Sequence, residues 1–234
     1  MERLRVSQAS LLALMLSACA TTSVSPSVAP LHSSSAAYSA LPVYQDMGMG
    51  GQDRKTFEIM LGSREMSDGD WDVSDGSDNW DLSTHSVFGI GSSRAPADGS
   101  ISPEWSLLIA QGSDSDNVGA VKVDLDATSI EFGFGARKTF NIDGSPIAPY
   151  IGAGIGLVTT VIEASGSAGG QSASIAESDS ALGVYFHGGA NFWVGDSFSL
   201  GLDYRVLTGA GYVDALDGLD ADYSQFMFVL GFAN

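Results

Sequence analysis

Residues 182–194 read LGVYFHGGANFWV, and residues 198–206 read FSLGLDYRV. In both stretches, apolar side chains occupy every second position over most of the length, as at Leu182 and Val184. The positions between them are mostly small, polar or charged, as at Gly183. Side chains on a β-strand point alternately to its two faces, so each stretch predicts a strand with one apolar face.

The same alternation recurs through residues 54–234 and predicts eight strands. Three connections are short and rich in Asp, Gly, Pro and Asn, as tight turns require. The other four are long, and the two kinds alternate along the chain. This order predicts an all-β fold, an eight-stranded antiparallel up-and-down transmembrane β-barrel. The short connections are 94–100, 141–146 and 195–197, and the long ones are 63–81, 113–128, 163–179 and 210–222.

The residue types on the strand faces opposite the apolar ones distinguish a membrane barrel from a soluble barrel. A soluble barrel would carry Lys, Glu and Thr there, whereas these positions hold mostly Gly, Ser and Ala with a few charges. Small side chains suit the interior of an eight-stranded barrel, which has room only for side chains or one small ligand. The apolar faces should therefore point outward as a band about 25 Å tall, with Tyr and Trp near its edges. We expect Phe186, Phe192, Leu200 and Phe228 in this band.

Charge is distributed unevenly between the two ends of the predicted barrel. The formal net charge is −18, and the four long connections carry 18 of the 28 acidic residues. Within them, only Arg64 and Lys122 offset this charge. An acidic surface of this kind argues against nucleic acid and other polyanions as partners. The basic residues that gather at the opposite end are Arg54, Lys55, Arg94 and Lys138.

The N-terminal region predicts export. Two arginines precede a short apolar run that ends in Leu16-Ser17-Ala18-Cys19, and the run is too short to span a bilayer as a helix. This ending resembles a bacterial lipobox, in which the cysteine is acylated. Ordinary cleavage after Ala20 is the alternative. We therefore predict a signal peptide over 1–18, lipidation at Cys19, a Ser- and Pro-rich periplasmic tether over 19–53, and the barrel over 54–234.

Several ionisable residues fall on the predicted interior face. Acids and bases enclosed together neutralise one another through charge-assisted hydrogen bonds and hold strands in register. We interpret the set as an internal salt-bridge plug, with a proton relay or gated pore as the alternatives. Its members are Glu58, His85, Glu131, Arg137, His187, Asp203 and Arg205.

Three segments carry a family resemblance. Residues 150–156 (YIGAGIG), 200–205 (LGLDYR) and 226–232 (FMFVLGF) resemble the small outer-membrane β-barrel family that includes the OmpA transmembrane domain and OmpX. The resemblance implies a bacterial outer-membrane location, with the N-terminus in the periplasm, the long loops outside and outer-membrane lipid around the barrel. It also implies insertion by the barrel-assembly machinery, which reads a terminal aromatic residue. Here two further residues follow Phe232.

Some eight-stranded barrels are lipid A deacylases or acyltransferases. The deacylases place a serine two residues after the catalytic histidine, whereas Gly189 stands at that spacing from His187. A Ser-His-acid set would have to be assembled from unrelated strands. We therefore expect no enzyme activity.

The first long connection is rich in aspartate. Alternating carboxylates in a Gly- and Ser-rich loop supply the oxygen ligands that Ca²⁺ takes, so weak Ca²⁺ binding is one interpretation. The EF-hand pattern fails, however, because Val73 and Asn79 stand where that loop needs Gly and Glu. A solvated acidic loop is the favoured interpretation, with no other cofactor expected. The carboxylates are those of Asp68, Asp70, Asp72, Asp75 and Asp78.

Together these patterns predict an outer-membrane barrel lipoprotein with a structural or surface-interaction role, exerted through acidic extracellular loops toward a ligand that the sequence does not name. Three alternatives remain open. A His-Ser-acid set at the membrane edge would favour a lipid-modifying enzyme. A continuous polar lumen without salt bridges would favour a narrow channel, and a large apolar interior would favour a soluble lipocalin-like lipoprotein.

Overall fold

The structure is a computed structural model, and it describes residues 53–67, 72–75, 78–118, 121–168, 171–212, 216 and 219–233. The predicted signal peptide, Cys19 and the predicted tether up to position 52 lie outside these residues. None of the described residues forms a helix long and apolar enough to cross a membrane.

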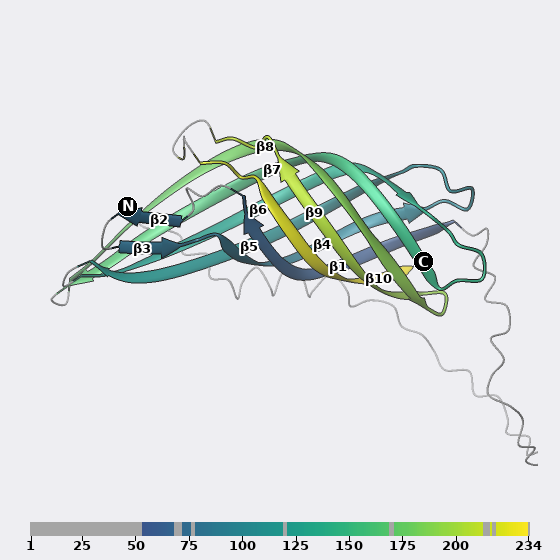
Figure 1. Ribbon diagram of the computed structural model, residues 1–234, viewed down its shortest axis with the longest axis horizontal. Coiled ribbons are helices and arrows are strands. Elements are labelled where there is room, and N and C mark those ends of the chain that lie inside the picture. Colours follow the sequence, from purple (N-terminus) through teal and green to yellow (C-terminus); the bar gives the residue numbers. More distant parts are fainter. Residues whose placement is uncertain are drawn as a thin grey trace, which may run out of the picture. The chain divides into compact units, whose positions relative to one another are not determined.

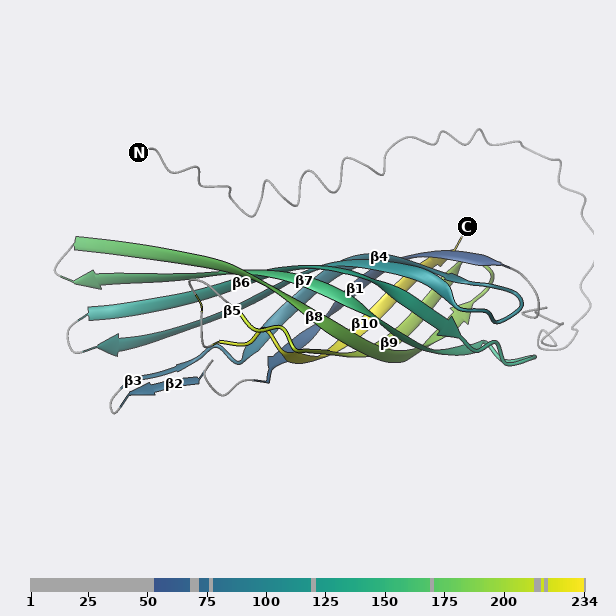
Figure 2. The same ribbon diagram turned by 90° about the horizontal axis from the view of Figure 1, so that it is seen from above.

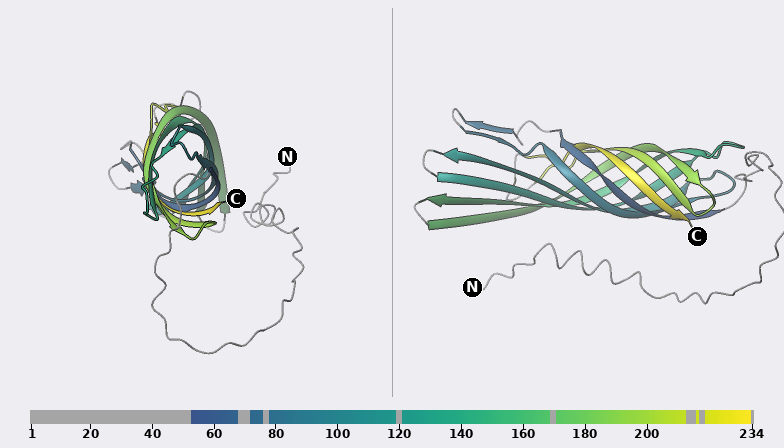
Figure 3. Two further views of the ribbon diagram at one scale, coloured as in Figure 1. Left: turned by 90° about the vertical axis from the view of Figure 1, so that its right-hand side faces the viewer. Right: turned by 90° about the horizontal axis from the view of Figure 1, so that it is seen from below.

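Eight strands close into a ring in which neighbouring strands are antiparallel (Figure 1; Figure 3, left). The order around the ring is β1-β10-β9-β8-β7-β6-β5-β4, and β1 pairs with β4 to close it. Strands β2 and β3 form a separate hairpin between β1 and β4. The predicted eight-stranded antiparallel barrel is confirmed. The strands are β1 (Arg54–Met66), β2 (Asp72–Asp75), β3 (Asp78–Asp81), β4 (Thr84–Ala95), β5 (Ser102–Val118), β6 (Val121–Thr139), β7 (Ile147–Ala168), β8 (Gln171–Val194), β9 (Phe198–Thr208) and β10 (Tyr223–Ala233).

The outer surface of the ring is apolar. Phe186 is 56% exposed and Phe228 is 61% exposed, and Phe192 and Leu200 are exposed as well. The expected outward direction of these four side chains is therefore confirmed. Residues between them along the strands are buried inside the ring, as the alternation requires.

The predicted positions of Tyr and Trp are mostly wrong. Only Tyr204 and Trp105 are exposed on the outer surface among the described Tyr and Trp side chains whose burial is resolved. For Tyr150, Tyr185 and Tyr223, the phenolic hydroxyl explains the difference, because each donates a hydrogen bond to a buried carboxylate. The Tyr and Trp side chains that are buried instead are Tyr150, Tyr185, Tyr212, Tyr223 and Trp193.

Three short turns define one end of the barrel, which we call the turn rim. They join β4 to β5, β6 to β7 and β8 to β9. Gly144 and Gly195 adopt positive φ angles of 71° and 74°, a conformation that residues with a side chain rarely take. The opposite end, where β5 meets β6 and β7 meets β8, is the hairpin rim.

Two of the predicted long loops are strands. The segments 113–128 and 163–179 continue β5, β6, β7 and β8 beyond their barrel neighbours, so that β5 pairs with β6 up to Val118↔Val121 and β7 pairs with β8 up to Ala168↔Gln171. The acidic composition of these segments led to the prediction of loops. They form strands because backbone hydrogen bonds between β5 and β6, β6 and β7, and β7 and β8 continue through them. We call residues 112–118, 121–127, 162–168 and 171–177 the sheet extension; it projects past the other strands in Figure 2.

The connection between β9 and β10 covers the interior at the hairpin rim. An isolated bridge joins Gly211 to Asp220, and Tyr212, Leu216 and Ala221 are buried among apolar interior side chains. These described residues of the predicted loop therefore pack into the end of the barrel rather than extending into solvent.

Candidate functional site

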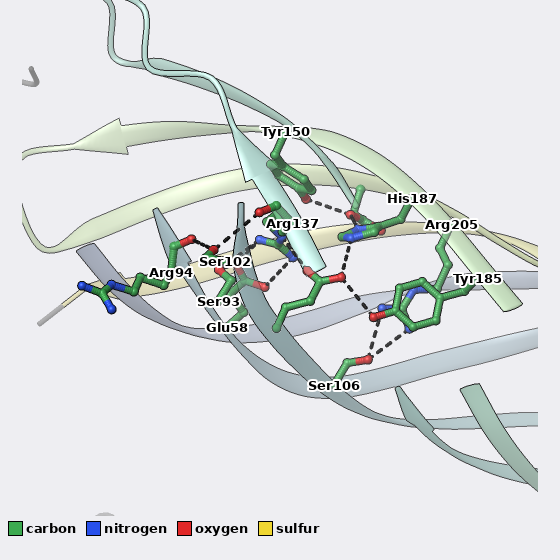
Figure 4. A network of polar contacts seen from close by, with 12 residues as sticks. Glu58, Ser93, Arg94, Ser102, Ser106, Arg137, Tyr150, Tyr185, His187 and Arg205 are labelled. Atoms are coloured by element: carbon green, nitrogen blue, oxygen red, sulfur yellow. Dashed lines mark hydrogen bonds and ion pairs between the residues drawn. The ribbon is translucent and has the colours of Figure 1, made fainter. Parts of the chain in front are cut away.

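All seven ionisable residues that the sequence places on the interior face are buried, each at 6% exposure or less. Six of them take part in ion pairs, and Figure 4 shows the part of the resulting network around Arg137 and His187. Further buried polar side chains join them from neighbouring strands. The site is therefore a polar core inside the barrel.

Arg137 on β6 connects two glutamates nearer the turn rim. Its Nη1 lies 2.7 Å from Glu58 Oε1 and its Nε lies 2.7 Å from Glu104 Oε2. Ser93 Oγ donates to Glu58 Oε1 at 2.9 Å, and the Tyr150 ring centroid lies 4.2 Å from the guanidinium carbon. One arginine thus links β1, β5 and β6 across the lumen.

His187 on β8 lies between two carboxylates. Its Nδ1 is 2.7 Å from Asp203 Oδ2, and its Nε2 is 2.8 Å from Glu104 Oε1. Tyr150 donates to the same Asp203 oxygen at 2.9 Å. An ionised carboxylate only accepts hydrogen bonds, so a ring that bonds one carboxylate through each nitrogen must donate from both. The geometry therefore fits an imidazolium.

A second cluster lies nearer the hairpin rim, around Glu131. Arg64 Nη2 is 2.7 Å from Glu131 Oε2, and Arg205 Nη1 is 3.1 Å from Glu131 Oε1. Tyr223 donates to Glu131 Oε2 at 2.7 Å, and Arg64 Nε donates to Gln225 Oε1 at 2.8 Å. Each carboxylate oxygen therefore has at least one donor.

Tyr185 joins the two clusters. Its hydroxyl donates to Glu104 Oε1 at 3.0 Å, while the Arg205 guanidinium carbon lies 4.2 Å from its ring centroid. With His187 as an imidazolium, the formal charges of the joined clusters balance at four positive and four negative. The carboxylates are Glu58, Glu104, Glu131 and Asp203, and the cations are Arg64, Arg137, Arg205 and His187.

The seventh predicted residue, His85, lies opposite Arg64 in the β1–β4 register, and its Nε2 is 2.9 Å from the Leu82 carbonyl oxygen. Sequence reasoning missed Glu104 and Arg64. Counting by twos along β1 from Glu58 reaches Arg64, but that position was assigned to a loop. Glu104 precedes Trp105 and therefore faces the opposite side of the strand, toward the interior. Apolar residues occur on both faces of this strand, so its alternation is too weak to identify Glu104 as an interior residue.

Glycines make room for the rings of the network. A Cβ atom on Gly152 would collide with the His187 imidazole, and one on Gly154 would lie 2.6 Å from Tyr185 Cζ. The GAG run on β7 therefore provides the space for large side chains that cross the lumen from β8.

The turn rim carries an exposed ion pair. Asp53 pairs with Arg94, and the Ala97 backbone N–H donates to Asp53 Oδ1 at 3.0 Å. The hydrogen bonds from Ala97 and Arg94 lower the pKa of the Asp53 carboxyl. Asp53 therefore connects the start of β1 to the turn between β4 and β5.

The remaining space in the polar core is small. The cavity between Arg137, His187, Asp203 and Arg205 has room for about one water molecule. In the described part of the chain, no group of three or more His, Cys, Asp or Glu side chains is arranged to hold a metal ion. Asp68 and Asp70 lie outside that part, as do the side chains of Asp72, Asp75 and Asp78, so Ca²⁺ binding there stays a prediction.

Chemically, the network is suited to cross-linking strands. Its acids and bases are already engaged with one another, and Ser93 and Ser106 hydrogen-bond to Glu58 and Arg205. Breaking such a buried pair costs about 3–5 kcal/mol, because it leaves an uncompensated charge.

A family model and one solved structure agree with this architecture. The family model described as outer membrane protein beta-barrel domain matches residues 10–232. The outer membrane protein OprG from Pseudomonas aeruginosa aligns with a TM-score of 0.53 and 11% identity, over 80% of this chain and 98% of OprG. Ail, the attachment invasion locus protein of Yersinia pestis, aligns with a TM-score of 0.39 and 16% identity, over 80% of this chain and 100% of Ail. A comparison with curated proteins gives no match.

Proposed function

The chain belongs to the outer membrane protein β-barrel domain family, and from that premise we propose that it is a surface-interaction protein whose sheet extension binds a cationic partner outside the cell. A barrel of this family sits in the bacterial outer membrane, which accounts for the apolar outer surface. The finer parts of the proposal concern which end binds and what it binds.

One observation carries the proposal: strands β5 to β8 continue in register well beyond the ring. Residues 171–183 of β8 have no partner on β9, whose pairing begins at Val184↔Thr208. At the rise of an extended strand, these residues span roughly 40 Å. A barrel needs no such extension to cross a membrane, so the extension supports a role beyond anchoring.

The outward face of the extension is acidic. Asp126 on β6 lies directly opposite Glu163 on β7, and both side chains are exposed. Like charges in this position repel each other, and cations from a partner would relieve the repulsion. Lys122 is the only basic residue in the extension, and its Nζ is already 2.5 Å from Asp124.

The edge of β8 offers a second means of binding. Residues 171–178 are exposed on both faces, and no strand in the described part of the chain pairs with this edge between residues 171 and 183. Unpaired backbone groups on an edge strand accept an extended segment of another protein. An extended basic segment would match both the edge and the charge.

The filled lumen supports binding outside the barrel over transport through it. Ion pairs cross the interior between β1, β5, β6, β8 and β9, and the connection after β9 covers the hairpin rim. The proposal includes no catalysis.

The orientation and the anchor are further parts of the proposal. The hairpin rim faces the outside, and the turn rim and N-terminus face the periplasm, where Cys19 carries a lipid and the barrel-assembly machinery inserts the chain. We expect a cysteine replacing Ser174 to react with a membrane-impermeant maleimide on intact cells, and one replacing Asn141 to react only after lysis. The reverse pattern would overturn the orientation.

Binding is tested with a fluorescent oligolysine peptide and the full chain in phosphatidylcholine nanodiscs. Asp126→Asn combined with Glu163→Gln should raise the Kd about 2- to 30-fold at low salt, since each exposed pair is worth about 0.2–1 kcal/mol. The matched control neutralises two exposed acids in the turns, Asp98→Asn and Asp143→Asn, and should leave the Kd unchanged. Equal effects of the two double variants would contradict the proposal.

A further inference from the structure

Three cations lie on the outer surface at one side of the turn rim. They are Lys55 on β1, Arg94 on β4 and Lys138 on β6, and all three side chains are exposed. Lys55 and Arg94 are register partners on adjacent strands. Each lies an even number of residues from an outward aromatic residue of its own strand, so all three share the face of the apolar band. The aromatic residues are Phe57, Phe88 and Phe134. We call the three cations the cationic edge.

Two of these cations are not engaged with acids. Within the described residues, neither Lys55 nor Lys138 has a carboxylate at ion-pair distance, whereas Arg94 pairs with Asp53. Lys138 Nζ lies 5.7 Å from the Phe140 ring centroid. The two lysines are therefore available to an anion that approaches along the outer surface.

An apolar surface continues from these cations away from the rim. Trp105 on β5 pairs with Ser92 on β4 and Phe134 on β6, so it lies two residues further from the rim than Arg94. Trp105 is 38% exposed and Phe134 is 54% exposed. Cations next to exposed aromatic rings match a lipid, whose charged headgroup lies above its acyl chains.

The arrangement is confined to one side of the barrel. Over their whole lengths, the strands β7, β8, β9 and β10 have no Lys or Arg at an outward position; Arg205, the one Lys or Arg in them, is buried in the lumen, as is His187. Arg54 belongs to the turn rim too, but its guanidinium lies 4.6 Å from the Trp193 ring centroid and 3.9 Å from Asp196. A ligand attracted by charge would therefore gather at β1, β4, β5 and β6.

We propose that the cationic edge binds the phosphate headgroup of an anionic phospholipid, while Trp105 and Phe134 contact its acyl chains. The lysine stems reach along the apolar surface to place their charges at the phosphate level. The occupant is a lipid and not free phosphate, because the site lies on the rim of the band that faces the bilayer. This site is independent of the proposed partner of the sheet extension, which lies at the opposite end.

Quenching of Trp105 fluorescence by brominated lipids tests the proposal. The other three tryptophans, Trp71, Trp80 and Trp193, are changed to Phe in the full chain, which leaves Trp105 as the reporter. Quenching in brominated phosphatidylglycerol is compared with quenching in brominated phosphatidylcholine, and the ratio gives the relative association constant. We expect a preference of roughly fivefold or more for phosphatidylglycerol at low salt, the size of the attraction of about one basic side chain to an anionic surface.

Adding Lys55→Gln and Lys138→Gln should bring this preference to about one, whereas Lys122→Gln, which removes an exposed lysine of the sheet extension, should preserve it. Heat-dependent gel mobility shows that each variant is folded. Equal quenching by the two lipids, or an unchanged preference in the double variant, would overturn the proposal. If inorganic phosphate abolished the preference where chloride at matched ionic strength did not, the site would take free phosphate and the lipid assignment would be wrong.

Discussion

His187 Nδ1 lies 2.7 Å from Asp203 Oδ2, and the opposite nitrogen of the same ring lies 2.8 Å from Glu104. These contacts join β8 to β9 beside it and to β5 across the lumen. Because both acceptors are carboxylates, the ring completes the balance of charge inside the barrel.

We predict that both ring nitrogens of His187 carry a proton at neutral pH. Two carboxylate acceptors require two donors, and a neutral imidazole has only one. Nitrogen-15 NMR of histidine-labelled protein in detergent should show both nitrogens in the range of N–H groups. The His187→Gln variant identifies the signals. One nitrogen in the unprotonated range would show that a carboxyl group holds the proton instead.

The barrel was predictable from the sequence because apolar residues dominate the outer face of β7 to β10 inside the ring, where Phe186, Leu200 and Phe228 alternate with small or polar residues. The interior was predictable only in part. The alternation along each strand places Arg137 and Asp203 inside the barrel. It does not show which acid pairs with which base, because the partners of Arg137 come from β1 and β5. Those pairings depend on the ring order and the strand register, which a single sequence does not show.

Removing the positive charge of Arg137 should destabilise the barrel strongly. Arg137→Met leaves Glu58 buried without a cation and Glu104 with His187 as its only cation, and we expect a loss of about 3–5 kcal/mol in the free energy of unfolding. Urea unfolding in detergent micelles measures it. Lys138→Met, one position along the strand and outward, is the matched control and should change the free energy by less than about 1 kcal/mol. Similar losses in both variants would contradict the cross-linking role.

The contacts of Asp53 with Arg94 and Ala97 should depend on pH in the acid range. Its folded pKa is lowered by hydrogen bonds from Ala97 and Arg94, so the ionised form favours the folded turn. The stabilisation is present above 3.8, the ordinary pKa of an aspartate, and is lost as the pH falls through the lower folded value. The Ala97 amide shift should titrate below pH 3.8 in NMR spectra. A titration that persists in Asp53→Asn would assign it to another group.

Lipidation at Cys19 is tested by labelling cells with radioactive palmitate. Cys19→Ala should abolish incorporation, because the thiol accepts the lipid. The variant should remain in the membrane fraction, since the apolar outer surface of the barrel is far larger than one acyl anchor. Unchanged labelling of the variant would exclude Cys19 as the acceptor.

Trimming the sheet extension tests the proposed function most directly. Gly112 and Ala127 are register partners, as are Ile162 and Glu177, so residues 113–126 and 163–176 can each be replaced by Asn-Gly without shifting the strands. Oligolysine binding to the full and trimmed chains is then measured in phosphatidylcholine nanodiscs, after gel mobility has shown that both barrels are folded. We predict that trimming weakens binding at least about tenfold, in line with the loss of several exposed charge pairs. Equal binding by the two chains would contradict the central claim that the extension is the interaction surface.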